Sequence, residues 1–268
     1  MRQARSYLFV PGERPARFAK AAASGADAIV LDLEDAVGPG SKDAARAQVC
    51  DWLAAGGPGI VRINGADTPW LAQDLAALEA FPHVAVMVPK AEPEAVAHVA
   101  ALLPGRPLLA LVETVAGLAH LRETACHPAV TRLAFGNLDF GADARIPGVA
   151  EVLDPARFEI ALASRLGGLP QPIEGVTVEL SDPEALRDDI RRARLRGFGA
   201  KLCIHPSQVA PVNEGFAPTA GEIDWARRIL AALAAAAGSV VQVDGKMVDR
   251  PLIDRARQIL GDAEPAPA

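Results

Sequence analysis

The sequence predicts an α/β protein built as a (β/α)8 TIM barrel with a C-terminal hairpin–helix extension. Eight short apolar runs alternate with stretches patterned as helices, and the chain length of 268 residues is typical of such a barrel. The apolar runs are continuous rather than alternating with polar residues, as expected for parallel strands covered on both faces. A doubly wound open sheet is the alternative, but no G-x-G-x-x-G follows the first run.

Strands and helices are expected to alternate along most of the chain. The predicted strands are Tyr7–Val10, Ala28–Leu33, Ile60–Ile63, Ala85–Val88, Leu108–Val112, Arg132–Phe135, Ile173–Val176 and Ala200–Ile204. The helical stretches between them include Arg14–Ala23, Asp43–Ala54, Pro69–Ala80, Pro93–Leu103, Pro155–Leu166 and Pro183–Arg196. Such crossover segments are what consecutive parallel strands require.

The chain changes character after the eighth strand. Glu222–Ala237 is an alanine-rich helical pattern, Val240–Val248 is typical of a hairpin with an Asp-Gly turn, and Arg250–Leu260 is patterned as a last helix. We therefore expect a catalytic barrel domain over residues 1–237 and a hairpin–helix extension over residues 238–268. Because a lone hairpin is barely stable in water, the extension should pack on its own barrel or on a neighbouring subunit.

Composition and charge argue against several classes of function. The net charge is −6 and there is no basic run, which disfavours a general nucleic-acid binder or a membrane-surface protein. No apolar run is long enough to span a bilayer, and no apolar signal region opens the chain. Cys50, Cys126 and Cys203 lie far apart without paired spacing, which is typical of reduced thiols. We expect a cytoplasmic protein that binds neither nucleic acid nor a membrane.

Polar or sharply turned residues follow nearly every predicted strand. In a parallel barrel the carboxyl ends of the strands meet at one rim, so these residues should converge there. Glu113 follows Leu108–Val112, and Asp139 follows the run that ends at Leu138. Two converging carboxylates suit a hard divalent ion such as Mg²⁺. Locally, Glu113 is also explained as an acid in a first helical turn and Asp139 as a turn residue; we favour the metal.

Two cations at the strand ends also suggest chemistry. Arg62 lies within an apolar strand, where an unpaired charge is costly, so it needs an anionic partner. A substrate carboxylate or enolate is a natural partner for its guanidinium fork. Lys90 follows the fourth strand and has two interpretations, a Schiff-base nucleophile or a salt bridge to Glu113 or Glu34. The salt bridge is the preferred interpretation.

Taken in order, these motifs resemble a known family. The segments that carry the resemblance are Arg5–Gly12, Gly25–Val37, Val61–Asn64, Val88–Lys90, Glu113–Thr114 with Gly117, Phe135–Phe140 and Ile204–Gln208. The chain resembles the citrate lyase β-subunit-like enzymes within the larger HpcH/HpaI aldolase group. The resemblance implies a Mg²⁺-dependent barrel that cleaves or forms a carbon–carbon bond in a 3-hydroxyacyl thioester.

The resemblance also implies roles for individual residues. It places the metal-binding pair at Glu113 and Asp139 and the active-site arginine at Arg62. The segment Gly245–Pro251 matches a G-[KT]-[ML]-[IV]-D-x-P pattern, in which some members carry a further catalytic aspartate delivered by an adjacent subunit. Asp249 would be that residue, although alone it reads as a helix cap. A closed homo-oligomer, a trimer or a multiple of three, is implied.

The remaining candidates concern the substrate and its carrier. Residues expected to contact the substrate beside Arg62 are Gly136, Asn137, Leu138, Glu34 and Lys90. Three cations are candidates for the phosphates of CoA, although each is equally explained as a solvated helix charge: Arg14, Lys42 and Arg46.

The sequence therefore predicts a Mg²⁺-dependent lyase that cleaves a citryl-, malyl- or citramalyl-type thioester to a 2-oxo acid and an acyl thioester. One alternative is a metal-dependent aldolase on free hydroxy-oxo acids without CoA, and another is a non-catalytic subunit of an acyl-carrier lyase complex. Retention of Glu113, Asp139 and Arg62 argues against the non-catalytic subunit. CoA binding separates the other two. The sequence leaves open whether cleavage, synthesis or thioester hydrolysis is the physiological reaction.

Overall fold

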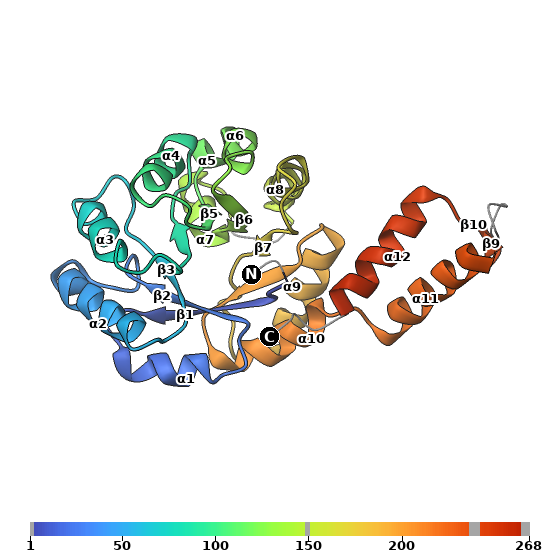
Figure 1. The fold of residues 1–268 in the computed structure, drawn as a ribbon, viewed down its shortest axis with the longest axis horizontal. Coiled ribbons are helices and arrows are strands. Elements are labelled where there is room, and N and C mark those ends of the chain that lie inside the picture. Colours follow the sequence, from blue (N-terminus) through green and yellow to red (C-terminus); the bar gives the residue numbers. More distant parts are fainter. Residues whose placement is uncertain (1–2, 148–150, 236–241, 264–268) are drawn as a thin grey trace. The chain divides into compact units, whose positions relative to one another are not determined.

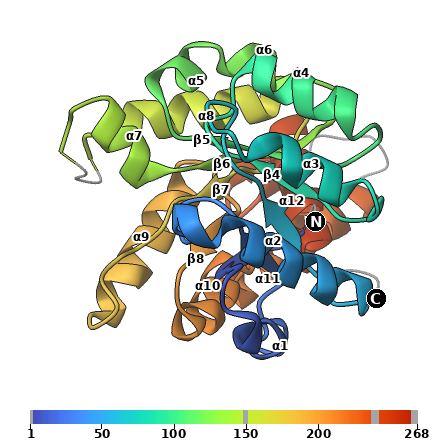
Figure 2. The ribbon, with the colours of Figure 1, turned by 90° about the vertical axis from the view of Figure 1, so that its left-hand side faces the viewer.

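The computed structural model describes residues 3–147, 151–235 and 242–263, and the chain divides into two compact units, Met1–Gly215 and Phe216–Ala268. In the first unit eight parallel strands close into a barrel, each strand paired with the next in the chain and the last with the first. Figures 1 and 2 show the helices of this unit lying outside the strands. The predicted (β/α)8 barrel is confirmed.

All eight predicted strands are present, and no strand end differs from its prediction by more than two residues. They are β1 (Ser6–Pro11), β2 (Ala28–Asp32), β3 (Ile60–Arg62), β4 (Val86–Val88), β5 (Leu108–Val112), β6 (Val130–Phe135), β7 (Ile173–Glu174) and β8 (Ala200–Cys203). β7 is shorter than the predicted Ile173–Val176. The reason is that the N–H of Val176 donates to the side chain of Asn137 and the carbonyl of Val176 accepts from it, so this backbone pairs with a side chain instead of a neighbouring strand.

Alternate strand residues fill the inside of the barrel, as the two-residue period of a strand requires. Closure pairs β1 with β8 through Tyr7 and Leu202, and both of these side chains point into the core. The buried residues of this core are Tyr7, Val30, Ile60, Ala85, Met87, Leu109, Leu111, Ala134, Ile173, Ala200 and Leu202. The barrel is thus packed with side chains, and the chemistry is left to the rim.

The helices of the first unit confirm the predicted crossovers and add shorter ones. They are η1 (Pro15–Arg17), α1 (Phe18–Ala22), η2 (Pro39–Ser41), α2 (Lys42–Ala54), α3 (Leu71–Leu78), α4 (Pro93–Leu102), α5 (Val115–Ala119), α6 (Leu121–Ala125), α7 (Asn137–Asp143), α8 (Asp154–Leu166), α9 (Pro183–Leu195), η3 (Pro206–Gln208) and α10 (Val209–Phe216). The sequence did not predict α5, α6, α7 or α10. These helices have at most 8 residues, too few to display a helical period.

The second unit is a helical pair with a small hairpin. It contains α11 (Ala220–Ala235), β9 (Gln242–Val243), β10 (Lys246–Met247) and α12 (Arg250–Ala263). The Asp-Gly turn of the hairpin is confirmed, because Asp244 and Gly245 have φ angles of 52° and 74°, as a type I′ turn requires. Across the described ranges, none of the helices combines the length and apolarity needed to cross a lipid bilayer.

The packing of α11 explains where the chain divides. Ala226 and Ile229 of α11 are buried together with Ala256 of α12, and Val243 and Val248 of the hairpin pack against them. The hairpin therefore has an apolar support within its own unit. The division falls between residues 215 and 216, whereas the sequence analysis placed α11 with the barrel and began the extension at residue 238.

Candidate active site

The rim of the barrel is organised around Arg62, the last residue of β3. Its guanidinium meets Asp32 through two parallel hydrogen bonds, with 2.7 Å from Nε to Oδ1 and 2.6 Å from Nη2 to Oδ2. Its centre lies 4.7 Å from the centroid of the Phe9 ring. The expected anionic partner was a substrate group; the protein itself already supplies one anion, Asp32, on the neighbouring strand.

The third guanidinium nitrogen of Arg62 faces two more acids. Nη1 lies 3.0 Å from Oε2 of Glu34, without the angle of a hydrogen bond, and 3.6 Å from Oδ2 of Asp35. Burial alone would lower the pKa of Arg62, but the charge and the hydrogen bonds of Asp32 oppose burial, and the pKa lies above its ordinary value. Arg62 therefore carries a permanent positive charge at the rim.

Glu113 follows β5 directly and is 2% exposed. Its Oε1 accepts a hydrogen bond of 2.8 Å from the backbone N–H of Lys90, and its Oε2 has no hydrogen-bond partner among the described residues. Burial, together with the charge of Asp139, raises the pKa of Glu113 to about 7, against the opposing effects of the Lys90 N–H and Arg62. A Cβ at residue 136 would lie 2.6 Å from Oε2, so only Gly136 fits beside this carboxylate.

Asp139 lies in the first turn of α7, and its carboxylate is more exposed than that of Glu113. α7 is held beside the end of β5 because Oδ2 of Asp143 accepts a hydrogen bond of 2.7 Å from the backbone N–H of Val115. Burial and Asp35 raise the pKa of Asp139. Since Asp139 in turn raises the pKa of Glu113, the two carboxylates lie within electrostatic reach of each other.

This pair of carboxylates fits a magnesium ion. Oε2 of Glu113 is a buried acceptor that lacks a partner in the described part of the chain, and Asp139 adds a second, accessible carboxylate. Within residues 3–147, 151–235 and 242–263 no group of three or more His, Cys, Asp or Glu side chains is arranged to hold a metal. Mg²⁺ commonly takes one or two protein carboxylates and keeps several water molecules, so two are sufficient.

Glu34, predicted as a substrate contact, is buried at the same rim. Burial raises its pKa to about 8, Arg62 opposes the rise, and Glu113, Asp35 and Asp32 add to it. The carboxyl group of Glu34 therefore holds a proton in the metal-free protein at neutral pH.

Replacing Glu34 by glutamine should stabilise the metal-free protein at alkaline pH but not at pH 5. The pKa of Glu34 rises from 4.5 to about 8 on folding, so the folded protein retains a proton that the unfolded chain releases between these values. The stability contributed by this proton is present below pH 4.5 and is lost as the pH rises through 8. Gln imitates the protonated form at every pH, so the melting temperature of Glu34→Gln should exceed that of the wild type by a margin that grows with pH.

Thermal melts in EDTA between pH 5 and pH 9 measure this margin. Glu94→Gln, at an exposed position in α4, is the control for a change of net charge. A constant difference for Glu34→Gln, parallel to that of Glu94→Gln, would contradict a raised pKa.

Lys90 contacts Glu113 through its backbone rather than its ammonium group. Its φ of 45° is left-handed, which turns the N–H toward Glu113, and its side chain is 46% exposed. Nζ lies 3.3 Å from Oδ2 of Asp67. The prediction of a salt bridge to Glu113 or Glu34 was therefore wrong, because the turn after β4 directs the side chain outward.

Lys42 is not available to the phosphates of CoA, contrary to the sequence-based expectation. Its Nζ is buried and donates to the carbonyl oxygens of Leu33 and Glu34, each at 2.8 Å, and to Oδ1 of Asn64 at 2.6 Å. All three donors of the ammonium group are used. Lys42 thus ties α2 to the loops that follow β2 and β3.

The other two CoA candidates differ from each other. Arg46 donates from Nε to Asp74 and from Nη1 to Asp43, each at 2.7 Å, and its side chain is largely buried, so these ion pairs replace the expected phosphate contact. Arg14 has a side chain that is 59% exposed, with Glu13 at 3.5 Å from its Nε. Arg14 remains a candidate for a phosphate contact.

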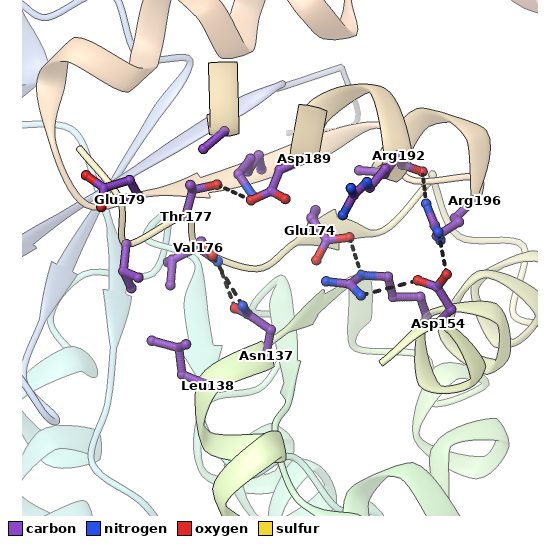
Figure 3. Close-up of a pocket in the computed structure, with 15 residues that line it drawn as sticks. Asn137, Leu138, Asp154, Glu174, Val176, Thr177, Glu179, Asp189, Arg192 and Arg196 are labelled. Atoms are coloured by element: carbon purple, nitrogen blue, oxygen red, sulfur yellow. Dashed lines mark hydrogen bonds and ion pairs between the residues drawn. The ribbon is translucent and has the colours of Figure 1, made fainter. Parts of the chain in front are cut away.

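Asn137, predicted as a substrate contact, pairs with the backbone of Val176. Its Oδ1 accepts from the N–H of Val176 at 2.9 Å and its Nδ2 donates to the carbonyl of Val176 at 3.2 Å, in the manner of a strand partner (Figure 3). A Cβ at Gly175 would lie 2.0 Å from Oδ1. Asn137 therefore holds the segment after β7, and the neighbouring Leu138, which is exposed, remains free to contact a substrate.

Asn137 and Leu138 border a polar cavity of about 260 Å³ between β7, β8, α8 and α9 (Figure 3). Within it the buried Lys201 donates to the carbonyl of Gly175 at 2.6 Å and lies 3.9 Å from Oδ2 of Asp189. Arg157 of α8 pairs with Glu174 of β7 at 2.9 Å. Acids balance the cations that line the cavity. These ion pairs join strands of the barrel wall to the outer helices α8 and α9.

Asp32 is a rim residue to which the sequence analysis gave no role. The signal that could have found it is an acid at the end of one apolar strand and an arginine at the end of the next. These residues are directly opposite each other in the register of β2 and β3, Asp32 against Arg62. A buried cation and a buried acid on adjacent strands predict a pair.

Asp249 lies in the second unit, where it caps α12. Its Oδ1 accepts a hydrogen bond of 3.2 Å from the backbone N–H of Leu252, as an N-cap residue does. Its side chain is exposed. Asp249 is therefore a helix cap, as its position in the sequence suggested, and its carboxylate is still accessible.

Known proteins resemble this chain in sequence and in fold. Residues 5–206 match the HpcH/HpaI aldolase/citrate lyase family. A citrate lyase subunit beta-like protein of Deinococcus radiodurans is 42% identical, with 96% of each chain covered. A (3S)-malyl-CoA thioesterase of Cereibacter sphaeroides is 37% identical, over 97% of this chain and 94% of that protein.

A solved structure is similar over almost the whole chain. CitE of Mycobacterium tuberculosis, in complex with magnesium, acetoacetate and coenzyme A, superposes with a TM-score of 0.85 and 34% identity, over 98% of this chain and 99% of that one. Both the sequence match and this likeness extend over the barrel that carries Glu113, Asp139 and Arg62. The chain therefore belongs to the HpcH/HpaI aldolase/citrate lyase family of enzymes.

Proposed function

We propose that this enzyme is a Mg²⁺-dependent carbon–carbon lyase that cleaves a citryl-, malyl- or citramalyl-type CoA thioester. The observation that carries the proposal is the buried Oε2 of Glu113, left without a partner in the described residues and close to Asp139 and the permanently charged Arg62. The magnesium and coenzyme A held by the similar CitE structure support both parts of the assignment.

The cleavage needs charge stabilisation at one end and a proton at the other. The 3-hydroxyl group loses its proton, the bond between C2 and C3 breaks, and its electron pair passes into a thioester enolate, leaving a 2-oxo acid. Held by Glu113 and Asp139, Mg²⁺ would supply Lewis-acid stabilisation of the substrate's carboxylate and carbonyl oxygens. Arg62 adds its fixed charge to this stabilisation. Asp249, as an acid, returns a proton to C2 of the enolate.

A panel of acyl-CoAs incubated with Mg²⁺, with products read by mass spectrometry, tests the proposal. Lyase activity on malyl-CoA yields glyoxylate and acetyl-CoA, whereas hydrolysis yields malate and free CoA. Hydrolysis is the second candidate, because relatives named (3S)-malyl-CoA thioesterase are similar over nearly the full length. Free hydroxy-oxo acids in the same panel test the aldolase alternative. If the enzyme turned over only those free acids and none of the acyl-CoAs, it would be an aldolase that does not use CoA.

The reaction is expected to depend on metal and not on a Schiff base at Lys90. The Lys90 ammonium is paired with Asp67, and only its backbone reaches Glu113. EDTA should stop turnover, and borohydride with a 2-oxo acid should leave Lys90 unmodified, as read by peptide mass spectrometry. A Schiff-base aldolase treated in parallel shows that trapping works. A reduced adduct on Lys90 would reverse the assignment.

We further propose that the active enzyme is a closed homo-oligomer, with a trimer as the expected form. The hairpin exposes 63% of Met247, an apolar residue two positions before Asp249. A segment exchanged head to tail between identical subunits closes naturally into a ring. In such a ring Asp249 of one subunit would complete the metal site of the next.

A further inference from the structure

The carboxylate of Asp32 is saturated by contacts inside the protein. Besides the two bonds from Arg62, Oδ1 accepts from the N–H of Glu34 at 2.9 Å and Oδ2 from the N–H of Ala36 at 3.2 Å. Asp32 is buried at the end of β2. With two donors on each oxygen, its carboxylate is committed to the protein and cannot also serve a ligand.

These contacts fix Arg62 along one edge and on one face of its guanidinium. Asp32 engages its Nε and Nη2, and the ring of Phe9 lies against the guanidinium plane. Nη1 remains on the side of Glu34 and Asp35. An arginine without a hydrogen-bond partner would adopt several rotamers, whereas a bidentate pair with a buried acid selects one of them.

We propose that Asp32 is a positioning residue, which orients Arg62 so that its Nη1 edge faces the substrate at the rim formed by Glu34, Glu113 and Asp139. The proposal rests on the proposed function, since it presumes a reaction at that rim. Arg62 influences the acidity of both Glu113 and Asp139, which places its charge near the two candidate metal ligands. Asp32 acts on the reaction through Arg62 and touches no substrate.

The same carboxylate also shapes the loop after β2. Its bonds to the N–H groups of Glu34 and Ala36 form a turn at the start of that loop. One side chain thus sets the position of Arg62 and of Glu34 together. A merely structural ion pair would predict a loss of stability alone, whereas positioning predicts a loss of turnover that stability does not explain.

Chemical rescue separates these two roles. Arg62→Ala should be inactive but should leave the Asp32 carboxylate aligned, so that millimolar guanidinium binds in the vacated space and restores part of the turnover. In Asp32→Asn/Arg62→Ala the charge-assisted bidentate partner is gone, so guanidinium should bind at least on the order of tenfold more weakly and rescue should disappear. Calorimetry measures this binding without any turnover.

A matched control comes from the outer wall of the barrel. Glu174 is also a buried acid paired to an arginine, with 2.9 Å to Nε of Arg157, but it faces α8 and not the rim. Glu174→Gln/Arg62→Ala should lose stability in the same way and still be rescued by guanidinium. Equal rescue in the Asp32→Asn and Glu174→Gln backgrounds would overturn the proposal.

Asp32→Glu keeps the proposal testable if Asp32→Asn does not fold. It retains the charge but moves the carboxylate by one methylene, so kcat should fall at least on the order of tenfold while KM changes little, because the orientation of Arg62 is lost. An unchanged kcat in a folded Asp32→Glu protein would refute the positioning role. If the wild type turns over no thioester, the proposed function fails, whereas calorimetric binding of guanidinium still decides whether Asp32 holds the guanidinium.

Discussion

Glu113→Gln and Asp139→Asn are each expected to abolish Mg²⁺-dependent turnover while the chain keeps its fold. Each removes one of the two carboxylates that fit the metal, and the buried Oε2 of Glu113 has no other partner in the described chain to lose. Loss of metal-based charge stabilisation, worth several kcal/mol, corresponds to at least ~10³-fold in kcat/KM. Steady-state kinetics and calorimetric titration with MgCl₂ measure the two effects. Glu94→Gln, on the exposed side of α4, is the control.

Magnesium affinity of the wild type should also depend on pH. Because the pKa of Glu113 in the metal-free protein is about 7, this carboxyl group must lose a proton before it can bind Mg²⁺ below that pH. Affinity should therefore fall as the pH drops from 8 to 6 and level off above the pKa. If both Glu113→Gln and Asp139→Asn retained the wild-type affinity for Mg²⁺, the assignment of these two residues as metal ligands would be wrong.

Two inactive variants are expected to restore activity to each other when their subunits mix. Asp249→Ala keeps an intact barrel and Glu113→Gln keeps an intact extension. If each site combines the barrel of one subunit with the extension of the next, random mixing in equal amounts makes about one site in four complete, so about a quarter of wild-type activity should return. Turnover after subunit exchange, with exchange verified by native mass spectrometry, is the measurement.

The control mixture is Glu113→Gln with Asp139→Asn. Both changes lie in the barrel, so no exchange of extensions can rebuild a complete site, and the mixture should stay inactive. Verified exchange without recovery in the Asp249→Ala mixture would mean that Asp249 acts in its own chain or only caps α12.

A further variant distinguishes the role of Asp249 as a helix cap from its role as a catalytic acid. Oδ1 of Asp249 accepts from the N–H of Leu252, and loss of such a cap costs about 0.5–2 kcal/mol. Asp249→Asn can keep this hydrogen bond but cannot donate the acid proton. An Asp249→Asn protein of normal stability and low activity would assign the carboxyl group to catalysis, whereas normal activity would leave it as a cap.

The sequence by itself determined the barrel and the place of its chemistry. Continuous apolar runs exist because each strand is buried on both faces, so the pattern is local and readable, and all eight strands are found where it predicted them. In a parallel barrel the carboxyl ends of all strands meet at one rim. This rule predicted that Glu113, Asp139 and Arg62 lie together, without any knowledge of distances. Short helices such as α5 and α7 were not predicted, because one or two helical turns are too short to show a periodic pattern of apolar residues.

Only the tertiary structure decided which charges face a ligand and which face the protein. Asp32 and Arg62 are 30 residues apart and meet because β2 and β3 pair in that register. Lys42 is as polar in the sequence as Arg14, yet its ammonium group is enclosed by two carbonyl oxygens and Asn64, whereas Arg14 is exposed. Hydrogen-bond partners and burial depend on contacts between distant segments, which local patterns do not encode.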